Sequence, residues 1–386
     1  MTRKTLGDFR PVYVVGIGLH RYQRASEKTY VELGLTAIRN ALSDAGISFS
    51  SVESTYTGTT FLGMAPSRAM LRHLGATGEP IAQVENASSS GSTAVRQAVL
   101  EVASGVCDVA LAVGIDKPGK VRLAHEKAGV PDLVNEYISP FTHFALLAHE
   151  YMNLHNVTAE QVANVAVKNY RNGAKNPYAH RQNGFSLEEI MAGSPIAGTL
   201  TQLQCCPIGE GAAAVIIASE DSIDELGIDR SRCVKFLSST SRSEKPYGAG
   251  ADPDTELTRE TLAMSCKEAG ILPNDLDVVE FHDGFSIEEL LYVEALGVCP
   301  VGKGAEQLAN GEFDIGGRLA VNPSGGLLAM GHPIGPTGVG QICEITQQLR
   351  GEAGERQQPD ANLGLAHMVG IGSVCFVNIL AGPNRE

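Results

Sequence analysis

Three polar positions lie where the chain is expected to turn, and their side chains suit proton transfer or hydrogen bonding. His332 lies within residues 322–340, NPSGGLLAMGHPIGPTGVG, which hold six glycines, three prolines and one histidine. Glycine costs roughly 1 kcal/mol and proline roughly 3 kcal/mol inside a helix, so this run is not an ordinary helix. Such backbone is typical of places where the chain approaches a ligand closely or directs N–H groups into a site.

Ser88 and the pair His282–Asp283 are the other two positions. Ser88 lies in ASSSG (87–91), between a strand candidate and a helix rich in small residues, and the histidine pair ends the strand candidate DVVEFHD (277–283). Imidazole and carboxylate groups can exchange protons, and a serine hydroxyl can donate a hydrogen bond or act as a nucleophile. The sequence allows three roles for Asp283: it orients the imidazole, accepts a proton, or caps the strand end. For His332, the competing interpretation is a packed structural side chain.

Composition narrows the class of protein. The chain has 386 residues, 43% hydrophobic and 19% charged, which suits a folded protein of two or three domains. A net charge of −14 argues against general nucleic-acid binding and against anionic membrane surfaces. The eight cysteines form no CxxC and no metal-type spacing, so we expect no metal site and a reducing, cytoplasmic location. No long apolar segment follows the N-terminus, so no signal peptide is expected.

Hydrophobic patterning predicts an α/β protein made of two similar halves. In the first half we expect strands at 12–18, 52–60, 82–86 and 108–114 and helices at 30–45, 65–74 and 92–104. The second half repeats this plan: DAGI (44–47) is echoed by EAGI (268–271), and each is followed by a strand. The turn and helix at Ser88 correspond to those at His332, and the 108–114 strand corresponds to the final hydrophobic strand. Residues 363–382 read as a glycine-rich turn that leads into that core strand.

Two strand–helix halves with small-residue helices predict two stacked sheets with those helices buried between them. We assign residues 1–116 and 207–230 to the N-terminal half, 117–206 to an inserted surface lobe and 231–386 to the C-terminal half. Within the lobe we expect helices at 145–154, 158–171 and 186–191. It also carries a basic group, read either as solvated surface or as a phosphate contact: Lys168, Arg171, Lys175 and Arg181.

Several segments together resemble the thiolase superfamily, most closely its sterol-carrier-protein-type branch. They are ENASSSGST (85–93), AVKNYRNGAKNPYAH (166–180), CCPIGEGAAA (205–214), FHDGF (281–285), NPSGGLLAMGHPIG (322–335) and LGLAHMVGIG (363–372). The resemblance implies a five-layered αβαβα fold, a homodimer and an acyl-CoA thioester substrate, with CoA as part of the substrate and no separate cofactor. It implies no nucleic acid and no membrane as partner.

The departures from that family concern thiols. Where ordinary relatives have a nucleophilic cysteine, this chain has Ser88, whose hydroxyl a helix N-terminus cannot usefully ionise. The branch tends to have a cysteine after the His-Asp pair, where Gly284 stands, and the turn MVGIGS (368–373) offers none. The thiols of Claisen chemistry are therefore missing, and ordinary thiolase activity is not expected.

A retro-aldol cleavage of a β-hydroxyacyl-CoA needs no covalent nucleophile. It needs donors for the enolate, a base at the β-hydroxyl and an acid for the α-carbon. The chain is similar to thiolase-like proteins without the cysteine that act this way in steroid side-chain breakdown with an OB-fold/zinc-ribbon partner. We therefore expect a lyase that forms a shorter acyl-CoA and a ketone or aldehyde. An acyltransferase that uses Ser88, and a non-catalytic acyl-CoA-binding scaffold, are the alternatives.

Two tyrosines complete the candidate site. Tyr247 lies in SRSEKPYGAGAD (241–252) and is expected near the thioester, whereas Tyr292 follows FHDGF at a helical spacing that also suits the core. The candidate catalytic residues are His332, His282, Asp283, Tyr247 and Tyr292. The candidate substrate-binding residues are Ser88, Gly331, Ser324, Gly325 and Gly372.

Overall fold

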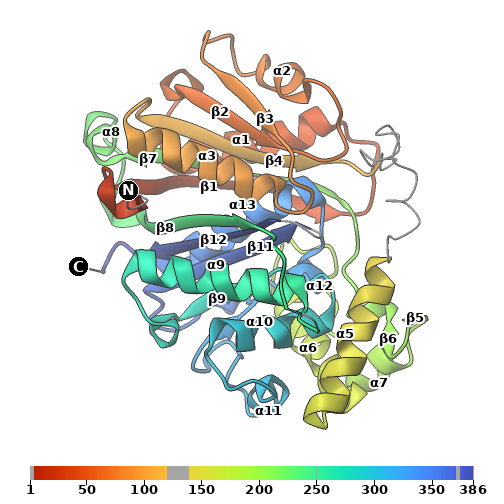
Figure 1. Ribbon diagram of the computed structural model, residues 1–386. Helices are drawn as coiled ribbons and strands as arrows, with labels where there is room; N and C mark the ends of the chain where they lie inside the picture. The colour runs from red at the N-terminus through yellow and green to blue at the C-terminus, as the bar shows by residue number, and fades with distance from the viewer. Residues whose placement is uncertain (1–3, 120–138, 249, 371–373, 386) are drawn as a thin grey trace.

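Ten strands run in one hydrogen-bonded order through the computed structural model (Figure 1), which describes residues 4–119, 139–248, 250–370 and 374–385. From edge to edge they are β10 (Ala320–Val321), β9 (Val278–Glu280), β11 (Leu363–Gly370), β12 (Val374–Ala381), β8 (Val234–Ser243), β1 (Val12–Gln23), β7 (Glu210–Ser219), β4 (Val109–Asp116), β2 (Ser54–Gly58) and β3 (Ile81–Val84).

The strands form two sets of five with the same arrangement. In the order β3–β2–β4–β7–β1, the first two pairings are parallel and the last two are antiparallel, and β10–β9–β11–β12–β8 repeats this pattern. The sets meet where β1 pairs with β8, through Tyr13↔Lys235 and Val14↔Val234. The predicted duplication is therefore confirmed, and a short edge-to-edge junction joins its two sheets.

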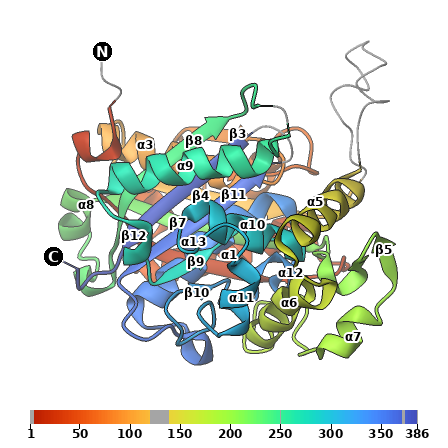
Figure 2. The same cartoon turned by 60° about the horizontal axis from the view of Figure 1, so that its bottom comes forward.

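Helices complete the five layers. Helix α1 (Tyr30–Ala45) covers the outer face of the first set of strands, and α9 (Pro253–Ala269) with α10 (Ser286–Leu296) lies outside the second (Figure 2). Between the sets lie α3 (Ser90–Ser104) and α13 (Ile334–Arg350), and α13 contacts β4 and β7 of one set and β11 of the other. The thiolase-like αβαβα fold expected from the sequence is thus present.

The repeat extends to how the helices end. Helices α1 and α9 stop at Gly46 and Gly270, which have φ of +72° and +69° and donate to carbonyls of the preceding turn. The prediction for residues 363–382 was incomplete. Strand β11 already fills 363–370, because each of its residues is buried between β9 and β12. By position in the sheet, β11 rather than the final β12 corresponds to β4.

The lobe predicted at 117–206 contains α5 (Pro140–His155), α6 (Ala159–Gly173), α7 (Leu187–Met191) and the hairpin of β5 (Pro195–Ala197) with β6 (Leu200–Thr201), grouped at the lower right of Figure 1. Helix α6 is not a surface helix, because it packs against α10 and against α12 (Gly326–Met330). The remaining short helices are α2 (Pro66–Leu71), α8 (Glu220–Glu225) and α11 (Gly304–Ala309).

Glycines let the two central helices touch at their N-terminal ends. A Cβ on Gly91 of α3 would overlap the carbonyl oxygen of Gly335, and a Cβ on Gly338 of α13 would overlap the Ser92 side chain and backbone. Close-packed backbone has no flexible atom that can give way. These glycines therefore set how closely the chain ahead of α3 approaches the chain ahead of α13.

We predict that Gly91→Ala lowers the free energy of unfolding by about 1–3 kcal/mol, the usual cost of overpacking. Helix propensity alone gives the opposite sign, since alanine is favoured over glycine by about 1 kcal/mol in a helix interior. Urea unfolding measures the difference. Gly184→Ala is the control, because a Cβ there meets nothing within 4 Å. A Gly91→Ala protein as stable as the wild type would contradict the packing described here.

Candidate active site

Ser88 and His332 meet between the two central helices. Ala87 adopts a φ of +47°, and this sharp turn precedes Ser88 and the start of α3. The His332 N–H donates to the Pro207 carbonyl at 2.9 Å, which ties the GHP turn to the CCPIGEGAAA segment. The two side chains are buried, with Ser88 Oγ 3.0 Å from His332 Nε2.

Hydrogen-bond partners define which nitrogen of His332 carries the proton. The Thr337 hydroxyl donates to the Pro333 carbonyl at 2.6 Å, so its oxygen accepts from His332 Nδ1 at 2.9 Å. Nδ1 is then the protonated nitrogen, and Nε2 has the lone pair to which Ser88 donates. Burial, together with the neighbouring His282, holds the pKa of His332 well below its ordinary value. At neutral pH the imidazole is an uncharged base directed at Ser88.

His282 is held by a carboxylate. Its Nδ1 lies 3.0 Å from Glu288 Oε1, and Glu288 also accepts from the Tyr292 hydroxyl at 3.0 Å and from the Phe285 N–H at 2.8 Å. Glu288 thus collects three donors and orients the His282 ring through Nδ1. Nε2 of His282 is buried and has no hydrogen-bond partner among the described residues. The rings of His282 and His332 are 5.3 Å apart at 82°.

The other predicted catalytic residues occupy different positions. Asp283 accepts from Asn169 Nδ2 at 2.7 Å and from the Leu327 N–H at 2.6 Å, so it fixes α12 and makes no hydrogen bond to His282. Burial, then the nearby Glu289, raises its pKa well above the ordinary value. Tyr292 is buried and acts on His282 through Glu288. The alternative prediction for Tyr292, a core residue, therefore also fits its buried position.

Tyr247 differs from Tyr292 because its hydroxyl is buried without a hydrogen-bond partner among the described residues. Burial is the main cause that raises its pKa, and its ring lies under the Lys245 ammonium at 5.6 Å. A protonated, unengaged phenol is available as a donor to a ligand. Its predicted proximity to the substrate stays a prediction.

The predicted substrate-binding residues divide in the same way. Ser88 faces His332, and Gly331 lies between His332 and His180, where a Cβ would come within 2.9 Å of His180 Cβ. Ser324 bonds instead to Glu280, and Gly325 packs on the backbone of Gly173. These two residues hold the turn together and show no direct link to the Ser88–His332 pair. Gly372 lies outside the described residues.

Three residues of the site were missed at the sequence level. Thr337 and Glu288 orient the two histidines, and Asp254 lies half-buried in the first turn of α9. Burial, then the carboxylate of Asp252, raises the pKa of Asp254 to about 7, and the charges of Glu288 and His282 also act on it. The spacing His282-x5-Glu288 and the acidic start of α9 were visible, but both also fit ordinary helix N-termini.

The basic group predicted on the lobe is only partly a surface patch, because Arg171 and Lys175 are exposed whereas Lys168 and Arg181 bond inside the fold. Lys168 is buried and bonds to Glu289, Asn169 and the Val321 carbonyl, because the face of α6 that carries it packs against α10 and α12. Arg171 pairs with Asp314 at 2.5 Å. Arg181 bonds to Tyr170 and to two backbone carbonyls.

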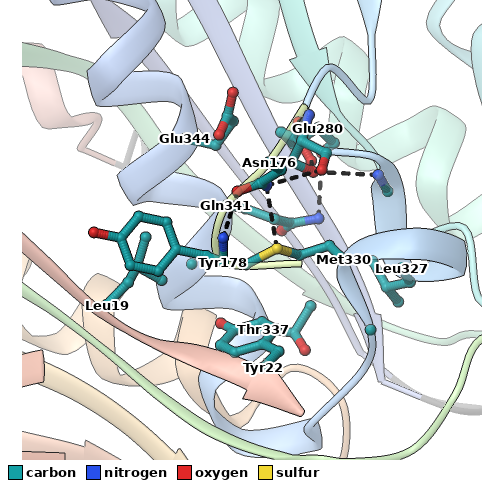
Figure 3. Close-up of a pocket in the computed structure, with 14 residues that line it drawn as sticks. Leu19, Tyr22, Asn176, Tyr178, Glu280, Leu327, Met330, Thr337, Gln341 and Glu344 are labelled. Carbon is teal, nitrogen blue, oxygen red and sulfur yellow. Dashed lines mark hydrogen bonds between the residues drawn. The ribbon is translucent and has the colours of Figure 1, made fainter. Parts of the chain in front are cut away.

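A small cavity lies behind the GHP turn (Figure 3). The volume that the centre of a water molecule can occupy in it is about 20 Å³. The residues that line the cavity include Glu280, Thr337, Gln341 and Glu344. Gln341 Oε1 is buried without a partner among the described residues. Glu280 accepts from the Ser324 N–H at 2.9 Å and lies 2.7 Å from its hydroxyl. Burial, then the nearby Glu344, raises the pKa of Glu280 to about 8.

The chain belongs to the thiolase superfamily. The family model described as "Thiolase, N-terminal domain" matches residues 17–191, and that described as "Thiolase C-terminal domain-like" matches residues 241–381. Within the superfamily the chain falls in the sterol-carrier-protein-type branch. It is 36% identical to human sterol carrier protein 2 over 393 residues, which cover 96% of this chain and 72% of that protein.

Two further matches cover nearly the whole chain. Benzoylsuccinyl-CoA thiolase subunit BbsB of Thauera aromatica is 36% identical over 371 residues, covering 94% of this chain and 95% of that protein. A solved structure described as an Ltp2-ChsH2(DUF35) aldolase matches with a TM-score of 0.83 at 23% identity, covering 97% of this chain and 99% of that one. The latter likeness shows the fold.

Two absences concern the described residues. None of their helices combines the length and the apolar character that crossing a membrane requires. Nor do these ranges bring together three or more His, Cys, Asp or Glu side chains in an arrangement that could hold a metal ion.

We predict that Glu280 makes the protein less stable as pH rises. Its folded pKa of about 8 exceeds the ordinary 4.5, so the native state keeps a proton that the unfolded chain has lost. The stability that this proton contributes is fully present below pH 4.5 and is lost by about pH 8. In between, the free energy of unfolding falls by at most about 1.4 kcal/mol per pH unit. Urea unfolding at pH 6 and pH 8 measures it.

Glu280→Gln removes this titration and is expected to flatten the fall in unfolding free energy between pH 6 and pH 8. The exposed Glu79→Gln serves as the control and is expected to keep the wild-type slope. An identical pH dependence in wild type and Glu280→Gln would show that Glu280 is already ionised in the folded protein.

Proposed function

We propose that this protein is a carbon–carbon lyase that cleaves a β-hydroxyacyl-CoA by a retro-aldol reaction, without a covalent cysteine intermediate. The observation that carries the proposal is the uncharged His332, whose Nε2 lone pair points at a hydroxyl 3.0 Å away. This is the geometry required of a base that accepts a hydroxyl proton. The bulky acyl group, proposed to be a steroid side chain, rests on the family resemblance alone.

The reaction begins with polarisation of the thioester. We propose that His282 donates a hydrogen bond from Nε2 to the carbonyl oxygen, with its ring oriented by the Glu288 side chain at Nδ1. Such a donor strengthens its bond as the oxygen gains negative charge, and one donor of this kind is typically worth roughly 3 kcal/mol. The unpartnered Nε2 of His282 is therefore accounted for by the substrate oxygen.

Bond cleavage follows. His332 Nε2 takes the β-hydroxyl proton, directly or through Ser88. The Cα–Cβ bond breaks, a carbonyl forms at Cβ, and the electron pair of the bond passes into the thioester enolate. The ketone or aldehyde leaves, and the α-carbon takes up one proton to give the shorter acyl-CoA. The chain's fold likeness to a structure described as an aldolase supports this assignment.

The same structure is described with two names, Ltp2 and ChsH2(DUF35), which supports the proposal that this chain also works with a second protein. We propose an OB-fold/zinc-ribbon partner that helps to supply the acyl-CoA, and a cytoplasmic location.

A homodimer is proposed as well. Strand β3 stands at the edge of the sheet with one side unpaired, and such edges are ready to pair with another chain.

Acyl transfer through Ser88 is the second candidate. The observation that favours it is the same hydrogen bond, because a serine hydroxyl that donates to an oriented imidazole is also an activated nucleophile. The relative BbsB is described as a thiolase subunit, which also speaks for acyl transfer. The two candidates differ in whether Ser88 becomes acylated.

We predict that a panel of β-hydroxyacyl-CoA esters, offered with and without the co-purified partner, includes one that yields a ketone or aldehyde. Loss of a general base typically costs 10²–10⁴-fold, so His332→Ala is expected to lower kcat by about that factor. Ser88→Ala is expected to keep activity within about tenfold, since Nε2 can accept the substrate hydroxyl directly. Carbonyl product is detected by hydrazone formation and mass spectrometry.

The exposed His73→Ala is the control and should behave like the wild type. Intact-protein mass spectrometry after incubation with the esters distinguishes the candidates. An acyl mass on Ser88 without carbonyl product would replace the lyase by an acyltransferase. Tight binding of CoA esters with neither outcome would leave a non-catalytic binding protein.

A further inference from the structure

A cysteine from another part of the chain lies beside the space over Gly284. A Cβ built on Gly284 would lie 3.8 Å from Cys206 Sγ, 3.4 Å from His282 Cε1 and 3.1 Å from Glu288 Oε2. Two backbone interactions hold the segments together. The Cys206 N–H donates a hydrogen bond to the Gly284 carbonyl at 2.8 Å, and Cys205 and Phe285 form an isolated antiparallel β-bridge. Position 284 lacks a thiol, and the thiol of Cys206 lies next to the space that a side chain there would take.

Cys206 differs from the other cysteines in its exposure. All eight cysteines are among the described residues and are free; seven are buried, whereas Cys206 is half-buried. Its neighbour Cys205 is turned away and lies 3.4 Å from the Thr201 carbonyl. The adjacent His282 has a buried Nε2 without a hydrogen-bond partner among the described residues, and the neighbouring ring atom Cε1 lies 3.4 Å from where a Cβ at 284 would be. The thiol and this nitrogen therefore border one region of the site.

The thiol is suited to donate a proton. Burial, then the carboxylates of Glu288 and Asp283, raises the pKa of Cys206, so sulfur keeps its proton at neutral pH. A protonated thiol is a poor nucleophile, which distinguishes Cys206 from a catalytic thiolate at a helix N-terminus. A strong anion such as an enolate can still remove that proton.

We propose that Cys206 is the general acid that protonates the α-carbon after bond cleavage. The assignment rests on the proposed lyase function. The enolate electron pair forms the new C–H bond as the S–H bond breaks, which leaves the shorter acyl-CoA and a thiolate. The proton that His332 took from the β-hydroxyl then returns to sulfur. Both residues are restored, and no oxidant or reductant is needed.

The test is deuterium exchange at the α-carbon of the product acyl-CoA in D₂O, followed by mass spectrometry. Exchange runs the protonation step in both directions and does not require carbon–carbon cleavage. Cys206→Ala is expected to slow exchange by about 100-fold, the usual scale for loss of a general acid. Cys205→Ala is the matched control and is expected to exchange at the wild-type rate.

Two outcomes separate the proposals. Wild-type exchange in Cys206→Ala, with carbonyl product still formed, would overturn the role of Cys206 and leave the lyase intact. Exchange that depends on Cys206, with no carbonyl product from any ester, would overturn the lyase and keep Cys206 as an α-carbon acid. If Cys206→Ala does not fold, Cys206→Ser, which preserves the side-chain volume, is measured instead and is expected to show the same loss.

Discussion

The close contact of two glycine-bearing helices is the constraint on which this site depends. Gly91 of α3 and Gly335 and Gly338 of α13 leave no room for a side chain at the crossing. Because each helix follows a tight turn, their approach also fixes the distance between the turns, and with it the 3.0 Å separation of Ser88 and His332. The duplication supplies one turn and one helix from each half, so the site lies where the two halves meet.

The polar groups around this contact are balanced by protons as well as by ion pairs. Buried carboxylates outnumber buried cations among the described residues: Lys168 pairs with Glu289 and Arg356 pairs with Glu344, whereas Glu280 and Asp283 are in neither pair. A buried carboxylate without a cation is costly unless it keeps its proton. The pKa values of Glu280 and Asp283 are accordingly raised, with burial as the first cause. The two histidines have different partners at Nδ1: the Thr337 hydroxyl oxygen for His332 and the Glu288 carboxylate for His282. In the proposed reaction His332 is the base and His282 is the donor.

Sequence patterns predicted the parts of the fold that rest on local periodicity and repetition. The helix at 30–45 has the expected bounds, and the duplicated halves and their small-residue helices are present. His332, His282 and Ser88 were identified because dense glycine turns and strand ends are local signals. The partners of these residues were not, because Glu288, Thr337 and Cys206 are ordinary residues until packing brings them to the histidines. The burial of Lys168 was missed for the same reason. A lysine on a helix usually faces solvent, but Lys168 bonds to Asn169, Glu289 and the Val321 carbonyl inside the fold.

The central claim is that His332 is an uncharged base with its lone pair on Nε2, and ¹⁵N NMR of the histidine side chains tests it most directly. The His332 signals are assigned by comparison with His332→Gln. At pH 7 the account predicts a protonated Nδ1 and an unprotonated Nε2, a preference lost in Thr337→Val. Protonation of both nitrogens at pH 7 would make His332 a donor, and the proposed base would have to be another residue.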